Sequence, residues 1–362
     1  MALKILVLVI FRFLFLFILF FPLGASGQQK EGANWFFGGL AQTNIPGTHL
    51  DFNGQGPVTT PFNYDYNSGS GVATISDKNG QLLFFSSQGY VATRQVVNGK
   101  YQEMPNGNVL PNNILGTSAE LISQSSADNQ VYHIFIITGA STSSNHDLYA
   151  AQVDMRLNNG FGDVVPNSVQ LLKKNVGYSM AAMVNANNRD TWLLSQSASG
   201  DSLQAYLISP NGIAAPVISV TSKKLDSQSR FKGSPNSGML VASGAPSPPL
   251  AGPPRVEIFL FNRATGAVAD LYTLTMPNAY QRGFSYAFSP NNSKLYVGTR
   301  TGMGHPSFIY QYDLAAGNVQ QIQQSVSIIN SFANIPQIMD MQLAINGKIY
   351  ISRTDQNPFL SV

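Results

Sequence analysis

The fold is decided by the stretch YAFSPNNSKLYVGT, residues 286–299. Apolar, β-prone ends flank a polar turn, Ser289–Ser293, and this pattern predicts two strands joined as a hairpin. Weaker copies recur along the chain, and their second strands can be aligned at Leu82, Val131, Trp192, Leu240, Leu295 and Ile349. The steps between these positions are 49, 61, 48, 55 and 54 residues. A period of roughly 50 residues, with room for four strands, is typical of a β-propeller blade.

The number of blades follows from counting these copies. Six copies plus the segment from residue 34 to about residue 70 predict six or seven four-stranded blades, and we favour seven. The chain stops at Phe359–Val362, which resembles a third strand without a fourth. Because a propeller must close its ring or leave an open edge, we expect the strand around Trp35–Phe37 to complete the last blade. Alternatively, the sequence is a fragment of a longer protein, truncated at its C-terminal end.

The composition supports an all-β fold. Charged residues make up 11% of the chain, against about 25% in an average globular protein, while 32 Gly and 20 Pro are present. This mixture suits short strands and tight turns better than long amphipathic helices. Intrinsic disorder is excluded because a hydrophobic content of 44% can fill a sizeable core.

The first residues have the composition of an export signal. A short basic start, Met1–Lys4, precedes the apolar run Ile5–Phe21, and small residues, Ala25 and Gly27, follow. We therefore predict a signal peptide over residues 1–27 and a single mature domain over residues 28–362, secreted or held at the cell surface. The alternative is an uncleaved membrane anchor, since the apolar run is nearly long enough to span a bilayer. No later stretch could do so.

Charge and cysteine content narrow the possible partners. Removing the leader removes Lys4 and Arg12, which leaves 21 − 2 = 19 basic against 18 acidic residues. The basic residues are scattered, so neither nucleic acid nor an anionic membrane surface is an expected partner. The absence of cysteine excludes disulfides and thiolate chemistry. We expect a monomeric domain that contacts an extracellular protein or glycan.

The four histidines give no metal-binding pattern. They are His49, His133, His146 and His305, and no two lie at the short spacings of metal sites. Three turn-like segments also have structural explanations: Asp77–Gly80 lacks the ligands of a calcium loop, Asn159–Gly162 precedes no helix that could receive a phosphate, and Asn291–Ser293 fits a turn as well as a glycosylation acceptor. We therefore expect no metal and no cofactor.

Two segments resemble the nucleophile elbow of serine hydrolases. They are Gly177–Ala181 and Gly283–Ala287, each with a central serine. That motif requires a strand-to-helix turn in an α/β sheet, which this chain lacks. Because the motif recurs with the blade, we interpret both segments as structural. No catalytic residue is predicted, and the ligand-binding residues cannot be assigned from the sequence.

An ordered set of phrases resembles one known group of proteins. The phrases are Asn34–Gly38 with Leu50–Phe52, Ala73–Asp77 with Leu82–Phe85, Met104–Gly107, Asp154–Val164, and Met341–Ala344 with Gly347–Tyr350. They are similar to the N-terminal, WD40-like propeller of secreted Bacteroidetes proteins associated with gliding motility and type IX secretion. The chain departs from that pattern at Ser86–Gly89 and in a Pro-rich run, residues 246–254. The resemblance implies a non-enzymatic surface or adhesion module and supplies no catalytic residues.

Three classes of function remain open at this point. The first is a non-catalytic propeller that mediates protein or glycan contact at the cell surface. The second is an extracellular enzyme acting on polysaccharide, which would need an axial cluster of acids with Tyr, Arg or a metal. The third is a structural spacer within a larger surface protein.

Overall fold

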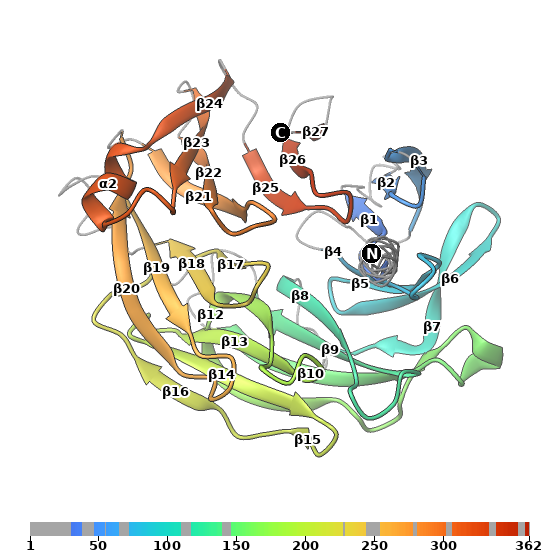
Figure 1. The fold of residues 1–362 in the computed structure, drawn as a ribbon. Coiled ribbons are helices and arrows are strands. Elements are labelled where there is room, and N and C mark those ends of the chain that lie inside the picture. The colour runs from blue at the N-terminus through green and yellow to red at the C-terminus, as the bar shows by residue number, and fades with distance from the viewer. Residues whose placement is uncertain are drawn as a thin grey trace, which may run out of the picture.

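The computed structural model describes most of the chain after the leader. It describes residues 30–37, 47–54, 56–64, 72–109, 117–139, 146–226, 229–243, 254–277, 281–301, 306–332, 338–353 and 359–361. Within these ranges the chain is all-β, with one α-helix, α2 (Val319–Gln324), and one 3₁₀ turn, η2 (Asn158–Gly160). Antiparallel sheets are arranged around a common axis (Figure 1). The predicted β-propeller is confirmed.

The first three sheets are formed by residues 34–220. The first sheet contains β1 (Asn34–Phe37), β2 (Gly47–Asp51) and β3 (Val58–Phe62). The second contains β4 (Val72–Ser76), β5 (Leu82–Ser87), β6 (Tyr90–Val97) and β7 (Lys100–Asn108). The next contains β8 (Thr117–Gln124), β9 (Val131–Thr138), β10 (His146–Asp154), β11 (Asp163–Val164), β12 (Gln170–Val184), β13 (Thr191–Ser197), β14 (Ser202–Ser209), β15 (Gly212–Ile213) and β16 (Val217–Val220).

Three further sheets complete the ring. They are β17 (Phe231–Gly233), β18 (Met239–Ser243), β19 (Arg255–Phe261) and β20 (Val268–Thr275); then β21 (Gln281–Phe288), β22 (Lys294–Thr301), β23 (Ser307–Asp313) and β24 (Ser327–Phe332); then β25 (Ile338–Leu343), β26 (Ile349–Arg353) and β27 (Phe359–Ser361). The Pro-rich run connects β18 to β19, the second and third strands of its blade, and lies outside the described residues up to residue 253. No helix in the described part of the chain is long and apolar enough to cross a membrane.

The nine-stranded sheet contains two blades, because β12 is shared between them. Its first part, Gln170–Val176, pairs with β10 as an outer strand, and its second part, Met180–Val184, pairs with β13 as an inner strand. The register of β12 against β13 shifts between Val176 and Met180, which marks the change of role. The six hydrogen-bonded sheets therefore correspond to seven blades, in agreement with the favoured count.

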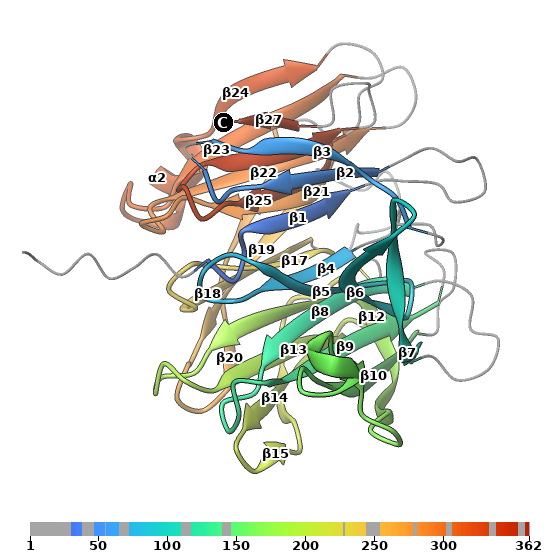
Figure 2. The ribbon, with the colours of Figure 1, turned by 90° about the vertical axis from the view of Figure 1, so that its right-hand side faces the viewer.

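Seven strands surround the axis. They are β1, β4, β8, β12, β17, β21 and β25, and each contacts the next one in this series. Figure 2, turned by 90° from Figure 1, shows strands such as β1 and β22 running roughly along the axis. The first of these strands, β1, runs in the opposite direction to its neighbour β4. The Ser76 N–H donates to the Glu31 carbonyl oxygen and the Thr74 hydroxyl donates to the Asn34 carbonyl oxygen, and these two bonds place β1 antiparallel to β4.

The N-terminal strand takes part in closing the ring, although not in the way that we expected. Instead of adding to the last blade, β1 pairs with β2 and begins a sheet of its own. The nearby segment Gly47–Asp51 satisfies its backbone edge locally, and aromatic packing then joins the first and last sheets. The Trp35 and Phe52 rings lie 6.0 and 5.1 Å from the Tyr350 ring, in edge-on geometries that favour attraction between aromatic rings.

The repeated hairpin turns have a shared hydrogen-bond pattern. Ser289 Oγ donates to Asn291 Oδ1 at 2.8 Å and accepts from the Lys294 N–H at 2.9 Å. Ser234 makes the same contacts with Asn236 and Met239, at 2.8 and 2.9 Å. Asn-containing turns satisfy their own backbone in this way. The Ser-Pro-Asn segments are therefore structural turns, as the recurrence predicted.

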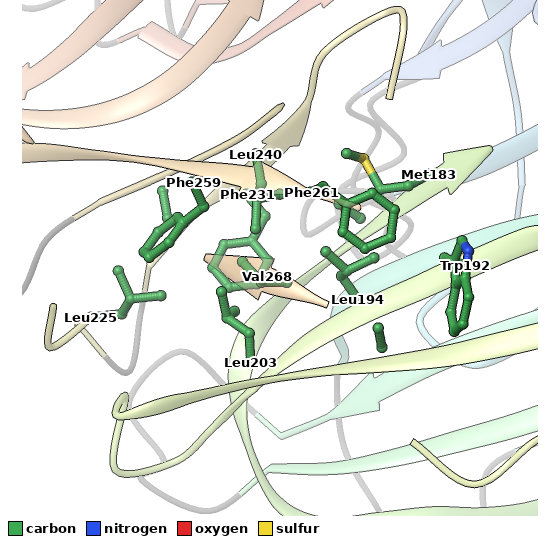
Figure 3. Packing of buried hydrophobic residues seen from close by; sticks show 13 residues of the cluster. Met183, Trp192, Leu194, Leu203, Leu225, Phe231, Leu240, Phe259, Phe261 and Val268 are labelled. Carbon is green, nitrogen blue, oxygen red and sulfur yellow. The ribbon is translucent and has the colours of Figure 1, made fainter. Parts of the chain in front are cut away.

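Large side chains from neighbouring blades interlock between the sheets. Figure 3 shows one such cluster, in which Trp192 and Leu194 of β13 face Phe259 and Phe261 of β19. The Trp192 indole N–H donates to the Arg263 carbonyl oxygen at 2.8 Å, so the ring is fixed at its polar end as well. Gly266 lies directly against this ring: a Cβ atom added there would come within 2.5 Å of Trp192 Cζ3.

Replacing Gly266 by Ala should destabilise the fold more than the same change at Gly99. Both glycines have φ of +77°, but a Cβ on Gly99 would meet nothing within 4 Å. The positive φ alone costs about 1–2 kcal/mol for an L-residue, and overpacking against Trp192 adds roughly 1–3 kcal/mol. Urea unfolding of both variants measures the difference. Equal losses of unfolding free energy in the two variants would show that the contact with Trp192 does not add to the cost of a side chain at residue 266.

Candidate ligand-binding site

A cavity of about 560 Å³ lies on the axis where the inner strands converge. Residues from all seven inner strands line it. The size falls within the roughly 300–1,000 Å³ of typical small-ligand sites. The inner strands face this space, and some side chains beside it, such as Met180 and Trp35, also take part in packing.

Most of the polar side chains of the cavity come from three consecutive blades. On β17, β21 and β25 the residues paired with Leu240, Leu295 and Ile349 are Gly233, Phe288 and Leu343. Counting back three positions along each strand gives Arg230, Ser285 and Asp340, and counting back one gives Lys232, Ala287 and Gln342. All of these except Ala287 line the cavity. One wall is therefore polar and charged.

The opposite wall is mostly apolar, with Thr74, Glu120 and Ser179 as its polar members. The same count along β4 and β12, whose reference residues Ser76 and Met183 pair with Leu82 and Trp192, gives Ala73 and Met180. These residues line the cavity together with Ile122 and Ala182, and β1 adds Trp35 and Phe37. The axial cavity is thus two-sided, with apolar and aromatic surface facing hydrogen-bonding groups.

The cations of the polar wall are held by neighbouring groups. The Arg230 guanidinium carbon lies 4.8 Å from the centre of the Tyr178 ring, a cation–π contact. Lys232 Nζ donates to Gln342 Oε1 at 2.6 Å, which links β17 to β25 past the intervening strand β21. These contacts orient both side chains, which remain partly exposed.

Two further polar groups face the same space. Asp340 is exposed and accepts a hydrogen bond from the Met341 N–H at 2.8 Å. Ser285 is only 2% exposed, and its Oγ has no hydrogen-bond partner among the described residues. A buried hydroxyl without a partner is costly. A ligand group at the axis could supply the missing hydrogen bond.

Other polar residues lining the cavity have structural roles. Glu120 accepts hydrogen bonds from the Ser86 hydroxyl and, at 2.8 Å, from the Gly89 N–H, and so ties the second blade to the third. Tyr286 donates to the Gly283 carbonyl oxygen at 3.1 Å. Burial raises the pKa of Tyr286 far above its ordinary value of 10.0, which keeps the phenol protonated.

The histidines lie apart from one another, on β2, β9 and β10. His49 Nε2 donates to Asn34 Oδ1 at 2.7 Å, and His146 Nδ1 donates to the Thr138 carbonyl oxygen at 2.6 Å. His133 is buried, and its ring stacks on that of Phe135 at 6.2 Å. His305 lies outside the described residues. Among those residues, no three His, Asp or Glu side chains come together to hold a metal ion.

The segments that resembled known motifs occupy ordinary positions in the blades. Ser179 and Ser285 lie on strands β12 and β21 rather than at strand-to-helix turns, and Ser179 Oγ accepts from the Phe231 N–H at 3.1 Å. Asp77 Oδ1 accepts from the Asn79 and Gln81 N–H groups, which stabilises a hairpin turn. Residues 159–162 form the 3₁₀ turn η2 and the loop that follows it.

Sequence reasoning missed the polar wall. Arg230, Lys232, Asp340 and Gln342 form no local motif, and they come together only when blades five to seven surround the axis. A signal was nevertheless present. When the copies are aligned on their second strands, the position three before the reference residue changes from Ala73 and Met180 in earlier copies to Arg230, Ser285 and Asp340 in later ones.

A second hollow, of about 940 Å³, adjoins the axial cavity. Ile122 and Ala182 line both spaces, so the two are adjacent. The hollow lies between the hairpin that joins β8 to β9, residues 125–130, and the hairpin that joins β12 to β13, residues 185–190. We call this space the vestibule.

Comparison with solved structures supports the fold alone. A periplasmic gluconolactonase of Pseudomonas aeruginosa aligns with a TM-score of 0.53 at 12% identity, over 91% of each chain. An oligogalacturonate lyase in complex with manganese aligns with a TM-score of 0.52 at 12% identity, over 92% of this chain and 87% of the other. Searches found no protein-family model and no curated protein sequence that matches. The chain is thus a β-propeller by structure.

The buried His133 should make stability depend on pH. Burial lowers the pKa of His133 below its ordinary value of 6.5, so the folded protein holds this ring neutral. The unfolded chain takes up a proton below pH 6.5, and stability should therefore fall as the pH falls through that value. The loss of unfolding free energy between about pH 7 and pH 5 should be smaller in His133→Leu. The difference should be about 1 kcal/mol for each unit by which burial lowers the pKa of His133. Urea unfolding at both pH values tests this; parallel losses would contradict it.

Proposed function

We propose that the mature chain is an exported, non-catalytic propeller that binds glycan in its axial cavity at the cell surface. The observation on which this rests is the two-sided character of the cavity. A sugar ring has apolar C–H faces and hydroxyl edges, which match Trp35 and Met180 on one wall and Lys232, Asp340 and Gln342 on the other. Amide and charged side chains together supply both donors and acceptors for hydroxyl groups.

Glycan is favoured over a protein partner by the shape of the site. Stable protein interfaces bury roughly 800 Å² on each partner, whereas the polar and aromatic side chains here surround a recessed space of about 560 Å³. The leader composition and the resemblance to secreted Bacteroidetes propellers support export and a surface role. In that setting the domain would act as the recognition module of an adhesive or motility-associated protein.

One observation favours a second candidate, an enzyme acting on polysaccharide. Two carboxylates, Glu120 and Asp340, line the cavity together with Arg230 and Tyr286. Glu120 is engaged by Ser86 and Gly89, however, and Tyr286 is kept protonated by burial. Product release from a glycan panel by the mature chain, abolished in Asp340→Asn, would establish turnover and replace the binding function proposed above.

Binding should depend on the polar wall of the cavity. Residues 28–362 should bind one or more members of a glycan array, and Lys232→Met should weaken the binding of those members about tenfold, since a charge-assisted hydrogen bond contributes roughly 1.5–3 kcal/mol. Lys174→Met, at an exposed lysine on β12 outside the cavity, is the matched control and should change nothing. Titration calorimetry measures both variants. No binding to any glycan by the unaltered domain would overturn the proposal.

A further inference from the structure

We infer that the site takes a neutral oligosaccharide rather than a single sugar, with one chain end in the axial cavity and the following sugars in the vestibule. This inference rests on the proposed function and specifies its ligand. It follows from three features of the described residues: the adjacency of the two spaces, two buried polar atoms without partners, and the balance of charge around the vestibule.

The two spaces adjoin each other, so together they offer a path from the axis to the surface. Ile122 of β8 and Ala182 of β12 lie at the junction, and Ala182 is exposed to the open space. The path leads from the axis to the face of the ring that bears the repeated hairpins. With volumes of about 560 and 940 Å³, the combined space is larger than the roughly 300–1,000 Å³ of a single small-ligand site. An extended chain fits this shape better than a compact molecule does.

The vestibule contains two buried polar atoms that lack partners. Asp190 is 8% exposed, and its Oδ2 accepts from Asn187 Nδ2 at 2.8 Å. Its Oδ1 has no hydrogen-bond partner within the described residues, and the same is true of Ser126 Oγ. Both residues line the vestibule. The hairpins that bear them are in contact, because Arg189 Nε donates to the Ser126 carbonyl oxygen at 3.1 Å.

The unpartnered atoms indicate the chemistry of the ligand. A carboxylate oxygen accepts hydrogen bonds, and a serine hydroxyl can donate or accept. Sugar hydroxyls can satisfy both at once. Ser285 Oγ, which also lacks a partner in the described part of the chain, provides a third such group at the axis. Hydroxyl partners for all three would have to come from different sugars, since Ser285 lines the cavity and the other two line the vestibule.

The charge of the vestibule favours a neutral chain. Glu31, Asp128 and Asp190 line it, against the single cation Arg189. Asp128 also forms an ion pair with Arg156, at 2.9 Å, which offsets part of this charge. A carboxylated or sulfated sugar would still bring a second negative charge close to Asp190, whose burial prevents water from screening the repulsion. Neutral hydroxyls meet no such penalty.

The test is a chain-length series. Calorimetry would compare residues 28–362 with neutral β-1,4-linked gluco-, manno- and xylo-oligosaccharides from monosaccharide to hexasaccharide, and with oligogalacturonides of matched length. We expect affinity for one neutral series to rise about tenfold or more from monosaccharide to tetrasaccharide, since each added charge-assisted hydrogen bond contributes roughly 1.5–3 kcal/mol. Oligogalacturonides should bind more weakly than neutral chains of the same length.

Variants locate the added contacts. Asp190→Asn and Ser126→Ala should reduce the affinity of the tetrasaccharide by about tenfold and leave that of the monosaccharide unchanged. Asp77→Asn, in the hairpin of another blade and outside both spaces, is the matched control. Thermal melting of each variant reports on folding, and the Ser126 variant preserves the test if Asp190 proves essential to its turn.

The possible failures are distinct. If no neutral or acidic glycan binds at any length, the proposed function is wrong. If monosaccharides and tetrasaccharides bind equally, or if the vestibule variants leave both affinities unchanged, the axial site exists without the extension and the present inference is overturned. Preference for oligogalacturonides would also overturn it.

Discussion

The structure depends on one constraint, which is that each blade is apolar on both faces. In β1, Phe36 packs towards the second blade against Phe62 and Phe85, while Trp35 packs towards the last blade against Tyr350. A sheet of this kind loses the hydrophobic contribution of one face wherever a neighbour is missing. Closure of the ring is therefore required for the stability of every blade, and the aromatic contacts between the first and last sheets provide it.

Polar contacts between blades fix the angle at which the apolar faces meet. Arg263 donates to the carbonyl oxygens of Val184 and Asn185, each at 2.9 Å, and its own carbonyl accepts from Trp192. Glu120 makes the corresponding link between the second and third blades. These bonds satisfy backbone groups that would otherwise be buried without partners, and they are directional where hydrophobic packing is not.

The same constraint leaves the axis free for function. Side chains between blades must remain apolar and well packed, whereas those at the inner edges face an open space. Blades two to four place mainly apolar residues there, and blades five to seven place Arg230, Lys232, Asp340 and Gln342. Because the strands that position them are held from both sides, these groups are organised before a ligand arrives. Preorganisation of this kind reduces the entropic cost of binding.

The sequence by itself determined the repeat, the strand type and the turns, because these depend on local patterns: alternating apolar residues, Asn-Gly and Ser-Pro-Asn turns, and a period of roughly 50 residues. It did not determine how the ring closes. Strand β1 could pair with the last blade or with Gly47–Asp51. The tertiary structure shows that it pairs with Gly47–Asp51, and that Trp35 and Phe52 then pack on Tyr350 of the last blade. Nor could it bring together Arg230 and Asp340, or Asp190 and Ser126, which are far apart in the chain and acquire a common function only when neighbouring blades surround the same space.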